Sequence, residues 1–195
     1  MVIYIYVIAN LIRILPHLLF FYFHPRHSLI RADLRRFCEI YKRDYHDFWG
    51  VCFFLLKVKE FRNIFYYRIG VRNSFFINWL CPQIDTLFIT TPDIGSGFFI
   101  QHGFTTYIAA KKIGKNVFIN QCVTIGFSDA YNQPEIGDNV RVGAGAKIIG
   151  GVRVGHNCIV GVNAVVVKNV PDNCTVVGVP AYIIRRNGKS IRENL

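Results

Sequence analysis

The chain has 195 residues, a hydrophobic content of 52%, a formal net charge of +11 and a pI near 9.6. This hydrophobic content is enough for a folded core and excludes an intrinsically disordered chain. The basic excess favours an anionic membrane surface or a phosphate-bearing ligand; no nucleic acid partner is expected, because no nucleic-acid-binding motif appears. The six cysteines have neither metal-binding nor disulfide spacing, so we expect reduced, structural thiols in a cytoplasmic protein.

Residues 1–25 form an apolar N-terminal segment. Its residues 2–23 include one charge, Arg13, and one proline, Pro16, and they lack the basic start and cleavage site of a signal peptide. The run is long enough to cross a bilayer, and the arginines after it would keep the rest of the chain at the cytoplasmic face. Because Arg13 and Pro16 interrupt it, two alternatives stay open: membrane association, spanning or interfacial, or a kinked helix buried in an oligomer.

Residues 26–84 are predicted to form a helical region. Apolar residues recur at helical intervals over 28–49, where Ser28 is a candidate N-cap, and a second helical stretch covers 49–67. A connector over 71–85 follows. Aromatic residues thin out after this region, which indicates a boundary with the next one.

A period of six residues dominates the second half of the chain. An aliphatic residue followed by a small or polar one recurs at Ile94, Ile113, Ile119, Ile125, Ile136, Val142, Ile148, Val154, Val160 and Val166. Six residues are three strand periods, so each hexad makes one short strand and a turn, and three hexads make one coil of a triangular solenoid. The pattern predicts a hexapeptide β-helix over 85–184, and with the preceding helices an α+β protein.

Two irregularities interrupt the repeat. The stretch from Ile100 to Ile113 is one residue longer than two hexads, and the loop between Ile125 and Ile136 is longer than a hexad. Solenoids accept insertions at their corners, where binding faces are built. The first irregularity contains His102, whose imidazole can take up a proton near neutral pH and act as a general base. The alternative is a histidine without a chemical role.

The other histidines give no metal site. Counting hexads from Ile100 to Val154 places His102 and His156 on different faces of the solenoid, so we expect no zinc or other metal. After Pro180 the strand pattern stops, and the basic tail 185–195 is expected to fold back or to leave as a short helix.

The repeat region resembles the serine acetyltransferase branch of the hexapeptide acyltransferases. The resemblance covers about residues 85–184 and rests on the segments 97–103 (GFFIQHG), 123–126 (VTIG), 134–140 (PEIGDNV), 142–148 (VGAGAKI) and 177–181 (VGVPA). The repeat alone is shared by many acyltransferases, whereas the histidine motif together with GAGAKI and GVPA is more specific.

The resemblance implies a left-handed parallel β-helix that forms homotrimers, with active sites between neighbouring subunits. It also implies transfer of an acetyl group from acetyl-CoA to a hydroxyl, with His102 removing the hydroxyl proton and backbone N–H groups holding the oxyanion. The coenzyme would lie along the coils near Gly126, Ala144, Gly145, Lys147, Ala164, Lys168, Pro180, Ala181 and Arg185, with the basic residues among them binding its phosphates.

Departures from the family pattern concern the acceptor. Gln133 stands where the serine enzymes have a second histidine before a proline, and Gln101 stands where they have an aspartate before the catalytic histidine. The carboxylate that orients the base would fall at Leu87, so Asp85 is the candidate for that role and Asp93 a poorer one. The acceptor is therefore L-serine or a sugar hydroxyl, free or in a glycan; the alternative is a catalytically silent trimeric scaffold.

Overall fold

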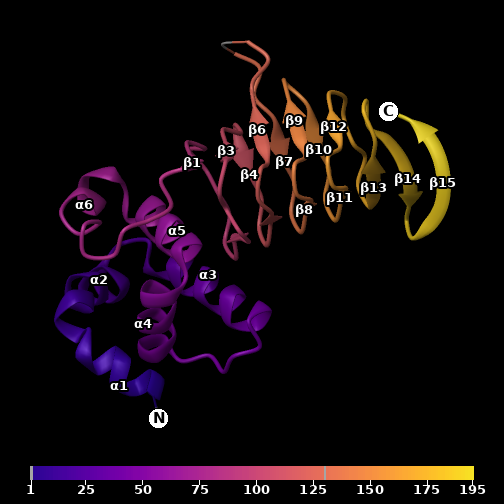
Figure 1. Cartoon of the computed structure of the whole chain (residues 1–195). Coiled ribbons are helices and arrows are strands. Elements are labelled where there is room, and N and C mark those ends of the chain that lie inside the picture. Colours follow the sequence, from indigo (N-terminus) through magenta and orange to yellow (C-terminus); the bar gives the residue numbers. More distant parts are fainter. Residues whose placement is uncertain (1, 130) are drawn as a thin grey trace. The chain divides into compact units, whose positions relative to one another are not determined.

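The computed structural model describes residues 2–129 and 131–195, with side chains described from Ile5 onward. Met1, at the start of the segment 1–25, and Ala130, in the long loop, lie outside the described residues. The chain divides into two compact units, Met1–Ile84 and Asp85–Leu195. The first unit is helical and the second is built of short strands (Figure 1).

The first unit contains short helices. They are α1 (Val2–Ala9), α2 (Leu11–Phe23), α3 (His27–Ile40), α4 (Asp47–Lys57), α5 (Lys59–Ile69) and α6 (Val71–Phe75). The apolar run is thus divided at Asn10 into two helices, and α2 contains Pro16. Among the described residues, no helix has the length and apolar character needed to cross a membrane.

The helical prediction for 26–84 needs three corrections of detail. The stretch predicted over 28–49 is not one helix, because α3 begins at His27, ends at Ile40 and is followed by Lys42 with a φ of 52°. Ser28 is not an N-cap, since it lies inside α3. The second stretch is broken at Val58, whose extended backbone separates α4 from α5; a β-branched residue tolerates that conformation well.

Aromatic rings form the core of the first unit. Phe37 from α3 meets Phe54 from α4 and Phe61 from α5 with ring centroids 5.4 and 5.1 Å apart. Beside this core, the buried Arg68 and Asp33 form a two-bond ion pair between α5 and α3, with N–O distances of 2.8 and 3.2 Å. The core and the ion pair explain why α3, α4 and α5 pack together despite the modest length of each helix.

The second unit is a three-sided parallel β-solenoid, with one sheet on each side. The first sheet holds β1 (Leu87–Ile89), β3 (Thr106–Ile108), β6 (Thr124–Gly126), β9 (Lys147–Ile149) and β12 (Val165–Val166). The second sheet holds β4 (Lys112–Ile113), β7 (Glu135–Ile136) and β10 (Arg153–Val154). The third sheet holds β2 (Phe99–Ile100), β5 (Phe118–Ile119), β8 (Arg141–Val142), β11 (Ile159–Val160), β13 (Cys174–Val177), β14 (Tyr182–Arg186) and β15 (Lys189–Asn194).

The hexapeptide prediction is confirmed by the register of the coils. Equivalent inward residues pair across neighbouring coils, as Ile113 does with Ile136 in the second sheet. All the aliphatic residues of the repeat are buried, at 3% exposure or less. Glycine after the aliphatic residue is required by the close approach of coils: a Cβ on Gly137 would lie 2.8 Å from the carbonyl carbon of Gly155.

The C-terminal segment folds back and does not form a helix. Strand β14 pairs antiparallel with β13, and β15 pairs antiparallel with β14, so the residues expected to form a basic tail from 185 extend the third sheet. Charged side chains on the last strands, with Arg186 bonded to Glu193 at 2.9 Å, are typical of an edge that is protected from further pairing.

Candidate functional site

His102 lies at a corner of the solenoid that is longer than its equivalents. The chain passes from the third sheet to the first through residues 101–105, whereas the next coil uses only 120–123 for the same corner. We call this passage from the third to the first sheet corner 3–1. Corner 1–2 leads from the first to the second sheet, and corner 2–3 leads from the second to the third. The extra residue predicted from the sequence is therefore located at the corner that carries His102.

The backbone holds His102 in an uncommon conformation. Its φ is 53°, in the left-handed region, and its side chain is exposed. The N–H of Phe104 donates to the His102 carbonyl at 2.7 Å, and the N–H of Gln101 donates to the carbonyl of Ile119 at 2.9 Å. The same left-handed conformation occurs at other turns of the solenoid, such as Thr105 and Cys122, so it reflects the tight corner. The arrangement presents the imidazole to the outside of the corner.

Asp85 lies at the same corner, on the preceding coil. The residue after it, Thr86, accepts from the N–H of Thr106 at 3.0 Å with its carbonyl and from the N–H of Thr105 at 3.2 Å with its hydroxyl. Within the described part of the chain, no hydrogen bond joins the Asp85 carboxylate to His102. Asp85 and His102 therefore lie at one corner, on neighbouring coils, without a hydrogen bond between them.

The other candidates for the orienting carboxylate are less suitable. The side chain of Leu87 is buried in the first sheet. Asp93 lies beside the second sheet, where its carboxylate is 3.4 Å from the Lys112 ammonium. Neither residue faces the corner that carries His102.

The long loop occupies a different corner. Residues 127–134 follow β6 and precede β7, so they form corner 1–2, and Gln133 lies half-buried near its end. The loop lies close to the next coil, since a Cβ added to Gly151 would be 3.2 Å from the Asn132 amide oxygen. Gln133 and His102 thus lie at opposite strand ends of the first sheet, and a single chain does not bring them together.

Asp129 organises the loop internally. Its carboxylate accepts from the N–H groups of Tyr131 and Asn132 at 2.9 and 3.0 Å, and from the Asn132 amide at 2.6 Å. The bond from the Tyr131 N–H, followed by those from Asn132, holds the pKa of Asp129 below its ordinary value. Sequence analysis did not single out this residue, although aspartate followed by a polar turn is a common signal for such a bond.

The residues expected along the coenzyme follow the first sheet and corner 3–1. Gly126 ends β6, Ala144 and Gly145 form corner 3–1 of the next coil, and Lys147 lies on β9, where its ammonium donates to the carbonyl of Cys122 at 2.7 Å. Ala164 precedes β12 and is fully buried, so only its backbone could face a ligand.

A pocket of about 460 Å³ lies at the end of this row. It is lined by Val167, Lys168, Val179, Pro180, Ala181, Tyr182, Asn194 and Leu195. The Lys168 ammonium donates to the carbonyl of Leu195 at 2.6 Å across it. Arg185 is not among the residues that line this pocket, although Tyr182 on the same strand, β14, is. The structure therefore collects Lys168, Pro180 and Ala181 and separates Arg185 from them.

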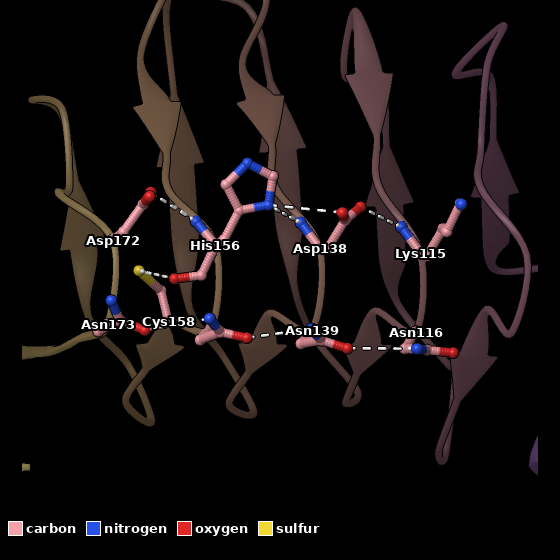
Figure 2. A network of polar contacts seen from close by, with 9 residues as sticks. Lys115, Asn116, Asp138, Asn139, His156, Cys158, Asp172 and Asn173 are labelled. Atoms are coloured by element: carbon pink, nitrogen blue, oxygen red, sulfur yellow. Dashed lines mark hydrogen bonds and ion pairs between the residues drawn. The ribbon is translucent and has the colours of Figure 1, made fainter. Parts of the chain in front are cut away.

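His156 lies at corner 2–3, so the prediction that it and His102 occupy different faces is confirmed. Its ring Nδ1 accepts from the backbone N–H of Asp138 at 3.0 Å, and the backbone N–H of His156 donates to the Asp172 carboxylate at 2.8 Å. Asp138 in turn accepts from the N–H of Lys115 at 2.7 Å (Figure 2). Each side chain thus caps the turn of the preceding coil. Among the described residues, no group of three or more metal-binding side chains occurs.

An asparagine ladder runs beside these bonds. The side-chain amides of Asn116, Asn139, Asn157 and Asn173 are joined in sequence at 3.2, 3.0 and 3.0 Å (Figure 2). All four have a positive φ, which asparagine tolerates better than other residues with a Cβ. Sequence analysis missed the ladder, although its signal is present as an asparagine two residues after the glycine or proline of each turn.

Asn139 tests how much this ladder stabilises the coils. Asn139→Ala should lower the free energy of unfolding by about 2–3 kcal/mol, because it removes two hydrogen bonds and places alanine in the left-handed region. Asn139→Gly should lower it less, since glycine keeps the backbone conformation and loses only the bonds. Urea unfolding followed by circular dichroism measures both. Equal losses in the two variants would mean that backbone strain makes no contribution.

The comparisons with known proteins agree with this geometry. Residues 133–168 match the family described as bacterial transferase hexapeptide (six repeats). The chain is 41% identical over 102 residues to the serine acetyltransferase of Staphylococcus xylosus, an alignment that covers 50% of this chain and 47% of that protein. The chain spans about half the length of the curated relatives it matches.

Solved structures extend the similarity beyond the repeat. The serine acetyltransferase of Brucella abortus strain S19 is 31% identical with a TM-score of 0.65, covering 83% of this chain and 69% of that one. The Neisseria gonorrhoeae enzyme is 30% identical with a TM-score of 0.67, covering 85% and 67%. Both the expected resemblance and the left-handed parallel β-helix that it implied are confirmed. Since the similarity to solved relatives includes the helices as well as the coils, the chain belongs to the serine acetyltransferase family.

Proposed function

We propose that this protein is an acetyl-CoA-dependent O-acetyltransferase in which His102 is the general base. The position of His102 supports this most directly: an exposed imidazole with a φ of 53° on the one-residue insertion of corner 3–1. In the proposed step, the imidazole accepts the proton of the acceptor hydroxyl while the hydroxyl oxygen forms a bond to the acetyl carbonyl carbon. The C–S bond then breaks, and the thiolate leaving group recovers the proton from the imidazolium.

The coenzyme is proposed to lie along the first sheet toward the pocket that contains Lys168. A structure of the Brucella abortus enzyme is a complex with coenzyme A, and in this chain Lys147 and Lys168 are the cations proposed to bind its phosphates. Asp85 is proposed as the positioning carboxylate, because it lies at the same corner as His102. Closing the distance between them would need ligand binding or a second chain.

The active assembly is proposed to be a homotrimer. Within one chain, His102 and Gln133 lie at opposite strand ends of the first sheet. A site that uses both residues must therefore take them from two chains. This supports the arrangement between neighbouring subunits that the family resemblance implies. Gln101 would face the same acceptor, since it directly precedes His102 on the corner.

L-serine is the acceptor that the relatives support, and a sugar hydroxyl is the second candidate. The structure of the Neisseria gonorrhoeae enzyme with serine supports the first. Exposed aromatic rings near His102 favour the second: Phe104 follows it by two residues, and Tyr107 lies 6.2 Å from Phe88 between ring centroids. Aromatic faces are suited to packing against the apolar face of a sugar ring.

The reaction is proposed to take place in the cytoplasm. All six cysteines are free, and five of them are buried, which fits a reducing compartment. Within the cytoplasm, the protein is proposed to lie at the face of a membrane, to which the first unit would bind.

The test is consumption of the acetyl-CoA thioester by purified protein, with L-serine and then with a panel of monosaccharides and oligosaccharides. Turnover with serine would mean that Gln133 replaces the missing histidine, and turnover only with sugars would establish the second candidate. Coenzyme binding is followed in parallel as a rise in melting temperature. A protein that neither binds coenzyme A nor turns over any acceptor would contradict the proposal and favour a silent scaffold.

A further inference from the structure

Helices α1 and α2 expose a row of large apolar side chains. The row consists of Ile5, Ile8, Leu11, Ile12, Leu15, Leu19 and Phe23, with exposed fractions from 37% to 91%. Within α2, Ile12, Leu15, Leu19 and Phe23 recur at intervals of three or four, so they share one side of that helix. The opposite side is buried in the first unit, as Ile14 and Phe21 show. We call the exposed row the α1–α2 stripe.

A second exposed apolar segment belongs to the same unit. Val71, Phe75, Phe76 and Trp79 are exposed by 86%, 72%, 68% and 71%, and we call them the aromatic turn. The Arg13 guanidinium donates to the Leu80 carbonyl, so the end of this segment lies beside α2. Soluble proteins rarely expose so many large apolar side chains unless these contact another surface.

Basic side chains accompany both segments. The Lys57 ammonium lies 3.8 Å from the centroid of the Tyr6 ring on α1, exposed Arg26 follows Phe23, and exposed Arg72 lies within the aromatic turn. Residues 1–32 contain no aspartate or glutamate. The surface around the stripe is therefore both apolar and cationic.

The acidic residues of the first unit do not offset this charge. Residues 1–84 contain twelve lysines and arginines and five aspartates and glutamates. Of the five acids, Asp33 is buried in its pair with Arg68, and Asp47 lies 3.2 Å from Arg31. Two such units brought together would repel one another, whereas an anionic lipid surface would attract them.

We propose that the α1–α2 stripe and the aromatic turn dock the first unit onto an anionic lipid surface, with α2 lying in the membrane plane. A helix with an apolar side and flanking basic residues binds in this way, and tryptophan and phenylalanine favour the headgroup boundary. The short helices suit this position, because neither α1 nor α2 is long enough to span a bilayer. The proposal rests on the first unit alone and is independent of acetyl transfer.

The first test is sedimentation of the full-length protein with lipid vesicles. Binding is expected to vesicles of phosphatidylcholine and phosphatidylglycerol (about 7:3), and it should weaken by about tenfold or more in phosphatidylcholine alone or at high salt. The double variant Ile12→Gln/Phe23→Gln should lower the partition coefficient by at least about tenfold. Val162→Gln is the matched control, because Val162 is 66% exposed on the second unit, and it should bind as the wild type does.

Trp79 reports insertion directly. The protein has two tryptophans, so a Trp49→Phe variant leaves Trp79 as the single emitter. Its fluorescence should shift to the blue on anionic vesicles and be quenched by brominated lipid. Sedimentation velocity without lipid, and circular dichroism of every variant, show whether the substitutions change assembly or folding.

Three outcomes would overturn the proposal. One is failure of the wild type to bind anionic vesicles, and another is equal binding by the wild type and a folded double variant. The third is loss of an oligomer in the double variant without any quenching of Trp79 in the wild type, which would make the stripe an interface between copies of the chain. Turnover with a soluble acceptor is expected to be unchanged in the double variant, so failure of lipid binding and failure of acetyl transfer remain distinguishable.

Discussion

His102→Ala should lower kcat/KM for acetyl transfer by about 10²–10⁴-fold, because general-base catalysis contributes a factor of that order. The side chain is exposed, so its loss removes no buried packing. Its positive φ of 53° would strain alanine by about 1–2 kcal/mol. His102→Asn avoids that strain, since asparagine tolerates the left-handed region, and it should be equally inactive.

His156→Ala is the matched control for this prediction. His156 is a partly exposed histidine of the same solenoid, but it lies at corner 2–3 and bonds the N–H of Asp138. Its replacement should leave turnover within about twofold while lowering the free energy of unfolding by about 1 kcal/mol. Thioester consumption and coenzyme-induced thermal shifts are measured for all three variants. Activity of His102→Asn close to that of the wild type would eliminate the general-base assignment.

Mixed assemblies of two variants test whether the site is shared between chains. Co-expression of His102→Ala chains with Gln133→Ala chains should recover part of the activity if one chain supplies the base and its neighbour supplies the loop. Each homogeneous variant should stay impaired. No recovery in a mixed assembly of confirmed stoichiometry would mean that His102 and Gln133 act within one chain or that Gln133 is not needed.

Asp33→Asn should be the most destabilising single substitution in the first unit, lowering the free energy of unfolding by about 3–5 kcal/mol. The Asp33 and Arg68 side chains are 1% and 2% exposed and joined by two bonds. Loss of the carboxylate charge leaves the guanidinium buried without its counter-ion. Chemical denaturation of the full chain, followed by far-ultraviolet circular dichroism, measures the change.

Glu39→Gln is the matched control on the same helix. Glu39 pairs with Arg36 at 3.1 Å on the exposed side of α3, and such surface pairs contribute at most about 1 kcal/mol. A double replacement, Asp33→Leu with Arg68→Met, should recover much of the stability lost in Asp33→Asn, because apolar side chains of similar volume need no counter-ion. If Asp33→Asn were no more damaging than Glu39→Gln, the buried pair would not contribute to stability.

The repeat was predictable because its information is local and redundant. Each inward aliphatic residue, such as Ile119 or Val142, contacts its equivalents in the neighbouring coils, so one rule of spacing recurs along the whole unit. The insertion at His102 was visible for the same reason, as a departure from a constant period. The place of His102 at a corner follows from the period alone.

Other features depended on contacts that spacing does not encode. Hydropathy presents residues 2–23 as one run, but the run is divided at Asn10 into two helices, and burial of Ile14 and Phe21 leaves the other side of α2 exposed. The tail from 185 carries charges typical of a free end, yet backbone pairing with β13 makes it part of the third sheet. The hydrogen bonds of the asparagine ladder join neighbouring coils, and hydropathy alone does not indicate them.

The sequence by itself determined the period of the solenoid, the length of its corners and the residues that differ from the serine enzymes. Only the tertiary structure decided which side chains meet at each corner. His102 and Gln133 lie at opposite strand ends of the first sheet, and Asp85 lies at the corner of His102 without a hydrogen bond to it. The physical reason for this difference is that each inward aliphatic residue of the repeat is specified by its own burial. The contacts made at a corner depend on how the coils stack, which is set by backbone bonds over the whole unit.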